Sequence, residues 1–387
     1  MSRKICVITS GRADYGLLLG VMRGINNDLD LKLQVIAAGS HLSMGLGATY
    51  TTIEADGFVI DKKVPSITGD DSSLGIAQSM GLAIAGFADA LASLSPDIVL
   101  VLGDRYEIFS AAAAALVARM PVAHIHGGEL TSGAYDDALR HCITKMSHLH
   151  FVATESYKQR VIQLGESPQA VFMVGGLGVD SILQEPPLSR IELEAALDFT
   201  LGHRNLLITF HPTTLSAESA TEQISQLLTA LDRLSDTHFI FTTPNADNGG
   251  GEILHQLEEF TKGKTHCKIY HYLGQQRYYA CLRHCDAVVG NSSSGILEAP
   301  SFKIPTVNIG TRQEGRLRAG SIIDCEATAD SIGAALELAY SQKFQSQLKE
   351  VKNPYGEGGA TPKIVEVLRD YPLHNITSKQ FFDWDSI

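Results

Sequence analysis

A loop of small polar residues in the second half of the chain has the composition of a phosphate-binding site. It follows an apolar run at 287–289 and precedes a predicted helix that begins near Ile296. The loop residues that offer hydroxyl donors or closely approachable backbone N–H groups are Ser292, Ser293, Ser294 and Gly295. The first N–H groups of a helix lack internal partners and the helix dipole favours negative charge there, so the loop indicates an anion site. An ordinary serine N-cap fits the same residues.

The residues that follow this loop fit the rest of a nucleotide. Glu298 lies one helical turn further on, where a carboxylate can accept hydrogen bonds from ribose hydroxyls. A glycine-punctuated loop then carries Arg312, Arg316 and Arg318, whose guanidinium groups suit the charge of a diphosphate. A solvated basic loop is the alternative interpretation.

Two motifs in the first half follow predicted strands. The GRADYG motif carries Arg12, which can bind a phosphate or a pyrimidine edge, or can instead pair with Asp14. Asp104 and Arg105 follow the apolar run at 98–102. Asp104 is either a carboxylate in the mouth of a site or the N-cap of the next helix, and this segment fits both roles equally.

Titratable side chains concentrate after a third predicted strand at 122–125. His126 and Glu129 flank a Gly-Gly turn, and Asp136 follows shortly after. Groups packed in this way can have their pKa values pushed apart, as proton abstraction and return require. His124 and His126 also have the spacing of metal ligands, so a metallohydrolase is the competing chemistry. Metal-free proton transfer is preferred, because a simple hydrolase has no use for a nucleotide site.

A lone histidine follows the first predicted strand of the second half, in the sequence FHPTT. Pro212 ends the strand and fixes the turn, so His211 is expected to face the site from the second domain. A structural role and a catalytic role both remain open for His211.

Apolar β-branched runs alternate with helix-period segments along most of the chain. Strands are predicted at 5–9, 33–38, 98–102, 122–125, 150–153, 206–210, 238–242, 268–270, 287–289 and 306–309. Helices are predicted at 73–94, 107–118, 137–146 and 218–234. This alternation predicts an α/β fold of two doubly wound Rossmann-like domains facing a cleft. The predicted divisions are residues 1–178, residues 179–372 and a tail at 373–387.

Bulk properties exclude several classes of function. The net charge of −12 argues against nucleic acid as the main partner. No signal peptide or membrane span is expected, and six scattered cysteines suit the reducing cytosol. Cys281 and Cys285 flank His284 but lack a second ligand pair, so buried thiols are preferred over zinc.

The assembled motifs resemble those of UDP-N-acetylglucosamine 2-epimerases, and more narrowly the bacterial hydrolysing type that feeds sialic-acid synthesis. They are, in order, GRADYG, VLGDRYEIFS, HIHGGE, DDALRHCITKMSHLHF, FHPTT, GNSSSG and GTRQEGR. The resemblance runs over nearly the whole chain. It implies the GT-B-like architecture of nucleotide-sugar glycosyltransferases, with UDP held mainly by the C-terminal domain.

The resemblance also implies roles for single residues. Ser292 and Ser293 match diphosphate-binding serines, and Glu298 matches the ribose ligand. Arginines lining the nucleotide site match Arg12 and Arg312. Residues of the catalytic site match Asp104, Asp136 and His211. Many relatives carry a catalytic glutamate where this chain has His126, so either His126 or the nearby Glu129 is expected to replace it.

The implied reaction converts UDP-N-acetylglucosamine and water to N-acetylmannosamine and UDP, through elimination to a 2-acetamidoglucal and rehydration. It needs no metal and no nicotinamide cofactor, and family habit suggests a homodimer or a higher homo-oligomer. Four alternatives remain: a non-hydrolysing epimerase, a hydrolysing epimerase for a bacillosamine-type sugar, a glycosyltransferase of the same fold, and a sensor that binds without turnover.

Overall fold

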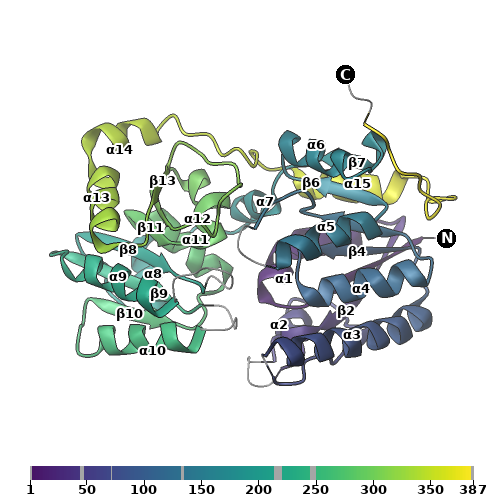
Figure 1. The fold of residues 1–387 in the computed structure, drawn as a ribbon, viewed down its shortest axis with the longest axis horizontal. Helices are drawn as coiled ribbons and strands as arrows, with labels where there is room; N and C mark the ends of the chain where they lie inside the picture. Colours follow the sequence, from purple (N-terminus) through teal and green to yellow (C-terminus); the bar gives the residue numbers. More distant parts are fainter. Residues whose placement is uncertain are drawn as a thin grey trace. The chain divides into compact units, whose positions relative to one another are not determined.

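A computed structural model describes residues 2–43, 48–70, 72–131, 135–212, 220–244 and 250–384 of the chain. The chain divides into two compact units, each built on one parallel sheet (Figure 1). The first unit comprises Met1–Glu129, Tyr135–Ser181 and Gly358–Ile387. The second comprises Leu130–Ala134 and Ile182–Glu357. The predicted α/β class with two Rossmann-like sheets is confirmed.

The first unit contains a seven-stranded sheet in the order β3-β2-β1-β4-β5-β6-β7, with all neighbours parallel. Its strands are β1 (Arg3–Thr9), β2 (Leu31–Ala38), β3 (Lys62–Val64), β4 (Ile98–Leu102), β5 (Val122–Ile125), β6 (Leu149–Val152) and β7 (Val171–Met173). The central strands are almost continuously apolar because both faces of the sheet are covered.

Helices cover the two faces of this sheet. They are α1 (Arg12–Asn27), α2 (Tyr50–Ala55), α3 (Ser73–Leu94), α4 (Tyr106–Val117), α5 (Asp136–Met146), α6 (Glu155–Gln163), α7 (Leu177–Gln184) and α15 (Ala360–Asp370). Apolar residues of α1 and α15 fill one core, and those of α3, α4 and α5 fill the other. Among the described residues, α3 alone has the length and composition of a membrane span. Its Ala83, Phe87 and Leu91 are nevertheless buried in the second of these cores.

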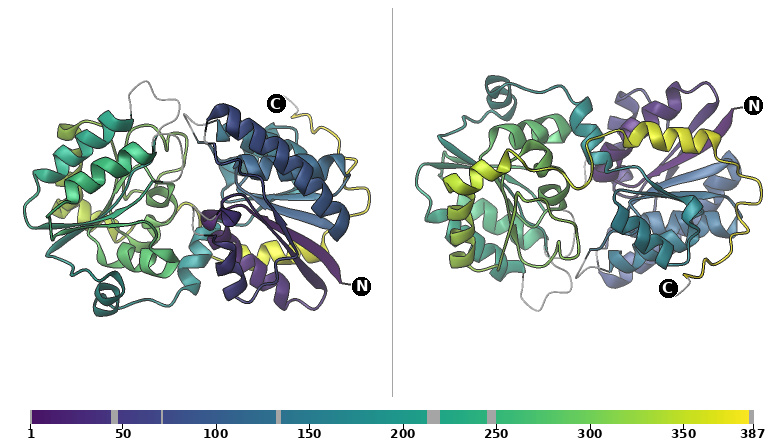
Figure 2. Two further views of the ribbon diagram at one scale, coloured as in Figure 1. Left: turned by 90° about the horizontal axis from the view of Figure 1, so that it is seen from below. Right: turned by 90° about the horizontal axis from the view of Figure 1, so that it is seen from above.

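Helix α15 packs along α1, although the two lie at opposite ends of the sequence (Figure 2). Ile364 and Leu368 on α15 are fully buried in the core that α1 also fills. The carboxylate of Asp180 accepts hydrogen bonds from the backbone N–H groups of Ala360 and Thr361 at 3.0 and 2.6 Å, which caps the start of α15. The sequence interpretation placed this segment within a second domain at 179–372. The structure instead packs it with the first unit, because its apolar face completes that core.

The second unit contains a six-stranded parallel sheet in the order β10-β9-β8-β11-β12-β13. Its strands are β8 (Arg204–Thr209), β9 (Thr237–Thr242), β10 (Cys267–Tyr270), β11 (Ala287–Gly290), β12 (Thr306–Ile309) and β13 (Ile322–Cys325). Its helices are α8 (Arg190–Leu197), α9 (Ala220–Asp232), α10 (Gly250–Thr261), α11 (Gly274–His284), α12 (Ser293–Leu297), α13 (Ala329–Tyr340) and α14 (Gln342–Leu348).

In each sheet the strand order reverses at one point. The first sheet reverses between β1 and β4, and the second between β8 and β11. Ligands of open α/β sheets bind beyond the carboxyl ends of the strands at such switch points. The turns after these four strands are therefore the places to look for function.

Candidate active site

In the first unit, the predicted residues Arg12 and Asp104 follow the two strands that flank the switch point. Arg12 is the first residue of α1, and Asp104 comes two residues after Leu102, the last residue of β4. The turn before Arg12 is held by Asp14, whose buried carboxylate accepts hydrogen bonds from the Ser10 and Gly11 N–H groups at 2.7 and 2.9 Å. Arg105 is half-exposed and pairs with the buried Glu107, with 3.5 Å between Nε and Oε2.

Arg140 connects the turns that carry the candidate catalytic residues. It lies on α5, is 3% exposed, and donates from Nη2 to the Asp104 carboxylate. Its Nη1 donates to the backbone carbonyl of His126 at 2.9 Å. The same guanidinium therefore holds both the Asp104 carboxylate and the turn that carries His126. Asp136 lies on the first turn of the same helix, one turn before Arg140.

His126 and Glu129 form a buried pair on the turn after β5. Their side chains are 9% and 2% exposed, and 3.6 Å separates Nδ1 of the ring from Oε1 of the carboxylate. His126 has φ = +66°, a left-handed conformation that costs a non-glycine residue about 1–3 kcal/mol. Such strain persists only where the surrounding structure enforces it, and it is concentrated at functional sites. Gly128, at φ = +77°, packs against the Tyr157 carbonyl so closely that a Cβ would lie 2.5 Å from the oxygen.

The geometry does not favour the metal-ligand interpretation of His124 and His126. Nε2 of His124 lies 2.8 Å from the Gly103 carbonyl, and Nδ1 lies 3.2 Å from the Thr144 hydroxyl. Both ring nitrogens are therefore engaged within the protein. Within the part of the chain that the structure describes, no three His, Cys, Asp or Glu side chains are grouped to hold a metal ion. This applies to the Cys281–Cys285 segment too, where His284 contacts the Leu188 carbonyl.

In the second unit, a reciprocal pair of hydrogen bonds joins the turns after β8 and β11. The His211 N–H donates to Oδ1 of Asn291 at 2.7 Å, and Nδ2 of Asn291 donates to the His211 carbonyl at 2.8 Å. Gly290 lies just before this contact at φ = +134°, where a Cβ would approach the Thr209 carbonyl to 1.9 Å. Only glycine fits at that position. His211 is thus fixed at the switch point, while Thr213 and Thr214 of the FHPTT motif lie outside the described residues.

The serine loop opens α12, which is shorter than the sequence suggests. Ser292 is the N-cap of a helix that runs only from Ser293 to Leu297, so local N–H and hydroxyl donors count for more than a helix dipole. Ser292, Ser293 and Ser294 are partly exposed. Gly295 packs against Thr306, where a Cβ would come within 2.7 Å of the threonine methyl group. The loop thus presents donors on one side and close packing on the other.

Glu298 ends α12 and is held by two hydroxyl groups. Ser294 donates to Oε2, and the Tyr279 hydroxyl lies 3.3 Å from Oε1. Burial raises the pKa of the Glu298 carboxyl, and the two hydroxyl donors act in the opposite direction. A carboxylate oriented in this way can accept hydrogen bonds from a vicinal diol.

The three arginines after β12 do not share one role. Arg312 donates from Nη1 to the Asn291 carbonyl at 3.1 Å, which places it beside the serine loop. Arg316 donates to the Leu130 carbonyl at 3.1 Å, and Nε of Arg318 lies 2.6 Å from Oδ2 of Asp324. All three guanidinium groups contact the protein, and of the three Arg312 lies beside the serine loop.

His211 is a buried imidazole close to a cation. Burial, with a further contribution from Arg312, lowers the pKa of His211 to about 3. The imidazole is therefore neutral at physiological pH. A bound anion beside Arg312 would offset that charge and raise the pKa.

Two important residues were not given a role by sequence reasoning. Arg140 stands in the quoted motif DDALRHCITKM, four residues after Asp136, and this spacing places both on one face of a helix. Asn291 stands within the serine loop but was not distinguished from the donors around it. The signal for Asn291 was its position: it is a polar residue directly after β11, one of the two strands that flank the switch point.

Comparisons with known sequences find one family and similar proteins that match over most of the chain. Residues 23–369 match the protein family described as UDP-N-acetylglucosamine 2-epimerase. A GDP/UDP-N,N'-diacetylbacillosamine 2-epimerase (hydrolyzing) from Campylobacter jejuni is 43% identical over 383 residues, covering 98% of this chain and 99% of that protein. Polysialic acid biosynthesis protein P7 from Escherichia coli is 38% identical over 388 aligned positions, covering 98% and 97%.

Structural comparison agrees on the fold. The crystal structure of UDP-GlcNAc 2-epimerase from Neisseria meningitidis bound to UDP-GlcNAc superposes with a TM-score of 0.81, covering 94% of this chain and 99% of that one. At 19% identity, this likeness concerns the fold alone. The family match and the two relatives carry the assignment further, and the chain belongs to the UDP-N-acetylglucosamine 2-epimerase family.

Proposed function

We propose that the protein is a hydrolysing 2-epimerase that acts on a nucleotide-linked 2-acetamido sugar and releases the nucleoside diphosphate. The observation that carries this proposal is the group of Asp104, Arg140, His126 and Glu129 in the first unit, in which the Asp104 side chain is 20% exposed and the other three are buried. It combines a carboxylate with a second proton-transfer group. The relatives named as hydrolysing and sialic-acid proteins support the same reaction class.

The reaction begins with removal of the proton from C2 of the sugar. As the C2–H bond breaks, its electron pair forms the C1–C2 double bond, and the C1–O bond breaks with its electrons on the departing diphosphate. The product is a 2-acetamidoglucal, and the base holds the proton. Water then adds, with hydroxyl to C1 and a proton to C2 from the opposite face, which inverts C2. This sequence needs two proton-transfer groups, one for each face.

We assign proton transfer to Asp104, Asp136 and the His126–Glu129 pair. Asp104 suits the base, because it is a carboxylate that Arg140 holds in place. Glu129 suits the role of orienting the His126 ring, since its carboxylate lies 3.6 Å from Nδ1 and both side chains are buried. Asp136 and His126 are the candidates for the proton that returns to C2.

We assign nucleotide binding to the serine loop of the second unit, and we assign substrate contacts in the first unit to Arg12 and Arg105. Ser292, Ser293, Ser294 and Gly295 supply donors for the diphosphate, with Glu298 for the ribose hydroxyls. Arg312 adds charge beside the loop. As the C1–O bond breaks, these donors stabilise the negative charge that accumulates on the leaving group. His211, neutral before binding, can donate a hydrogen bond there.

Two sugars are candidates. The Campylobacter relative, at 43% identity, favours a nucleotide-linked N,N'-diacetylbacillosamine. The family description favours UDP-N-acetylglucosamine, and the polysialic acid biosynthesis protein from Escherichia coli, at 38%, favours a product for sialic-acid synthesis, which would be N-acetylmannosamine. The former is placed first because its identity is higher.

The test is turnover of each candidate in heavy water. Purified protein is incubated separately with UDP-N-acetylglucosamine and with UDP- and GDP-linked N,N'-diacetylbacillosamine, and nucleotide and sugar are followed by chromatography and NMR. The expected result is free nucleoside diphosphate and a free sugar inverted at C2 with deuterium there, with activity that survives EDTA. A C2-epimer still attached to its nucleotide would identify a non-hydrolysing enzyme. Nucleotide release with hydrogen retained at C2 would indicate a transferase or a simple hydrolase.

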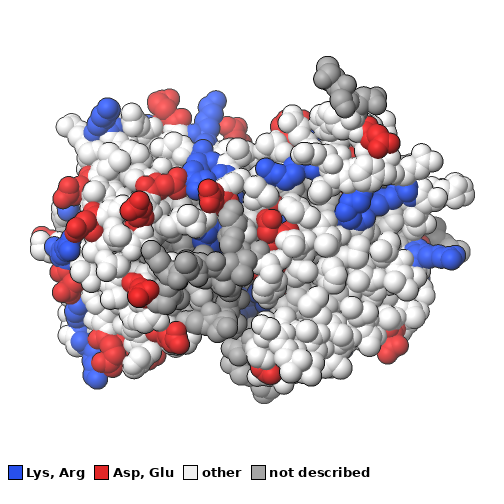
Figure 3. Space-filling model, viewed as in Figure 1, with Lys and Arg blue, Asp and Glu red and all other residues white. Residues whose placement is uncertain are grey.

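A homo-oligomer in the cytosol completes the proposal. The face formed by α3 and α4 carries few charged side chains (Figure 3) and exposes Leu82 at 54% and Val117 at 85%. A second copy of the chain is the partner proposed for that face. In sedimentation, the wild-type protein is expected to run as a dimer or larger, and Leu82→Glu is expected to shift it towards the monomer.

A further inference from the structure

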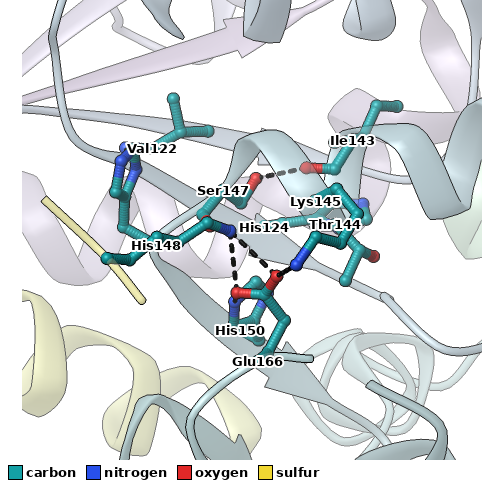
Figure 4. A network of polar contacts seen from close by, with 10 residues as sticks. Val122, His124, Ile143, Thr144, Lys145, Ser147, His148, His150 and Glu166 are labelled. Carbon is teal, nitrogen blue, oxygen red and sulfur yellow. Dashed lines mark hydrogen bonds and ion pairs between the residues drawn. The ribbon is translucent and has the colours of Figure 1, made fainter. Parts of the chain in front are cut away.

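His124 is a buried histidine that the proposed reaction does not use directly. It lies on β5, is fully buried, and pairs in register with Val101 of β4 and His150 of β6. Figure 4 shows it among the polar side chains beneath this part of the sheet, together with Thr144 of α5. An aliphatic residue would fill such a position without the cost of burying polar nitrogens, so the contacts that the imidazole makes need an explanation.

One ring nitrogen holds the turn that carries Asp104. Nε2 of His124 lies 2.8 Å from the carbonyl oxygen of Gly103, the residue directly before Asp104. Gly103 has φ = +86°, so the chain turns sharply there. Its N–H donates to the Ile125 carbonyl at 3.1 Å, which ties the same turn to β5.

The other ring nitrogen holds the turn that carries His126. The Thr144 hydroxyl lies 3.2 Å from Nδ1 of His124. Gly127 packs directly over this contact, since a Cβ on Gly127 would lie 3.1 Å from the hydroxyl and 3.2 Å from Nδ1. The Gly-Gly turn thus packs directly against the His124–Thr144 pair.

These contacts fix the tautomer of the ring. Burial lowers the pKa of His124 to about 3, so the ring is neutral and has one N–H group. A carbonyl oxygen can only accept, so the proton must lie on Nε2 and point at Gly103. Nδ1 then accepts from the Thr144 hydroxyl. Each partner has one assigned direction, and the arrangement has no alternative protonation state near neutral pH.

We propose that His124 is a positioning residue that, with Thr144, holds the Asp104 turn and the His126 turn in the geometry needed for proton transfer. This inference rests on the proposed function, because it takes those two turns to be catalytic. His124 itself touches neither the substrate nor the reacting atoms.

The test uses pairs of variants that remove or keep each hydrogen bond. His124→Leu removes both bonds, whereas His124→Gln keeps an N–H donor for the Gly103 carbonyl. Thr144→Val removes the hydroxyl, and Thr144→Ser keeps it. We expect His124→Leu to lower kcat on the order of 10- to 100-fold, as a misplaced catalytic group does, with KM and UDP affinity within about 2-fold. His124→Gln and Thr144→Ser should recover much of the activity that their partner variants lose.

His148 supplies the matched control. It is also buried, and its Nδ1 accepts from the Val122 N–H at 3.1 Å, at the opposite end of β5 from the candidate site. His148→Leu should lower thermal stability and leave kcat near that of the wild type. If His148→Leu and His124→Leu lose stability equally and both keep kcat, His124 is a structural residue and the inference fails.

A double-mutant cycle separates positioning from general destabilisation. In an Asp104→Asn background, His124→Leu should cost much less additional activity than it costs in the wild-type enzyme, because both changes act through the same group. Independent, multiplying losses would contradict the inference.

The crystal structure of His124→Leu distinguishes this inference from the proposed function. If the wild-type enzyme releases no nucleotide from any substrate, the proposed function fails. The positions of Asp104 and His126 in the His124→Leu structure then still test whether His124 positions the two turns. Displaced turns support the positioning role, and unmoved turns overturn it. Where His124→Leu does not fold, the Thr144→Val structure takes its place.

Discussion

Position 126 combines a strained backbone with a buried carboxylate neighbour. The family resemblance implies a glutamate at this position, whereas this chain has an imidazole. Glu129 lies close enough to His126 to orient the ring but stands on its own part of the turn. The two residues are therefore interpreted as a pair in which the imidazole transfers the proton and the carboxylate selects its tautomer.

Substitution of each partner tests this division of roles. His126→Asn is expected to lower kcat by about 10²-fold or more, the usual loss for a positioned acid or base, and Glu129→Gln by roughly 10-fold. Both are expected to bind UDP as the wild type does, as measured by calorimetry. If Glu129→Gln abolishes turnover while His126→Asn keeps a substantial part of it, the carboxylate has taken over the relatives' role and the assignment reverses.

Substitutions in the first unit should affect the chemical step, and substitutions in the second unit should affect nucleotide binding. Asp104→Asn and Asp136→Asn are expected to lower kcat by about 10²-fold while UDP affinity stays nearly intact. Ser293→Ala and Glu298→Ala are expected to raise the Kd for UDP instead, because each removes a contact made in the ground state as well. Near-wild-type kcat in both aspartate variants would show that the base lies elsewhere.

Residue positions could be predicted from sequence where a single strand end determines them. Asp104, His126 and His211 were located in this way and lie within two residues of the ends of their strands. Arg140 could not be given its role, because its contacts arise only when α5 lies beside the ends of β4 and β5. Arg316 and Arg318 look equivalent to Arg312 in sequence, and only the folded loop assigns them to Leu130 and Asp324.

Helices and strands also differ in how far local sequence predicts them. Buried central strands were predicted to within two residues, for example β8 and β9, because their apolar runs are long enough to recognise. The short edge strands β3 and β13 were missed, since three or four residues carry little pattern. The docking of α15 on α1 depends on contacts between opposite ends of the chain, which no local pattern reports.

The segment after α15 is fastened to the first unit by a buried carboxylate. Glu166, whose side chain is 2% exposed, accepts hydrogen bonds from Lys145 at 2.6 Å, from Lys379 at 2.8 Å and from His150 at 3.0 Å (Figure 4). Burial alone would raise the pKa of Glu166, but these cations and hydrogen bonds lower it to about 2. Lys379 also donates to the Ser147 carbonyl at 2.6 Å. The tail therefore contacts the turn between α5 and β6.

Removing this carboxylate should be costly. Glu166→Gln is expected to lower the free energy of unfolding by about 2 kcal/mol, because it removes a buried charge that accepts hydrogen bonds from two partly exposed lysines. Urea denaturation measures this. The matched control is Lys264→Met, which breaks the exposed pair with Asp232 at 2.7 Å and should cost under about 1 kcal/mol. Equal losses of unfolding free energy in the two variants would show that the contacts of Glu166 stabilise the fold no more than an exposed ion pair does.

At the scale of the whole molecule, buried neutral histidines make folding sensitive to acid. Burial lowers the pKa of His124 to about 3, of His148 to about 4 and of His211 to about 3, and also lowers the pKa of His150. In the unfolded chain these rings titrate near 6.5. Below that pH the unfolded state binds protons that the folded state excludes, so stability falls as the pH falls. Glu166 adds to this loss below about 4.5, because its folded pKa is lowered as well.

The first unit should therefore unfold in acid before the second. His124, His148 and His150 belong to the first unit, whereas His211 belongs to the second. Each ring contributes a slope of up to about 1.4 kcal/mol per pH unit between about pH 6 and 4.

Trp384, the chain's one tryptophan, stands on the segment after α15 and reports on the first unit by fluorescence. Its urea midpoint should fall steeply from pH 7 to pH 5, while hydrogen exchange in β8 and β11 changes less. In His148→Gln, which carries no titrating ring at that position, the slope should be smaller. A midpoint that is flat over this pH range would mean that the three rings of the first unit remain accessible to protons in the folded state.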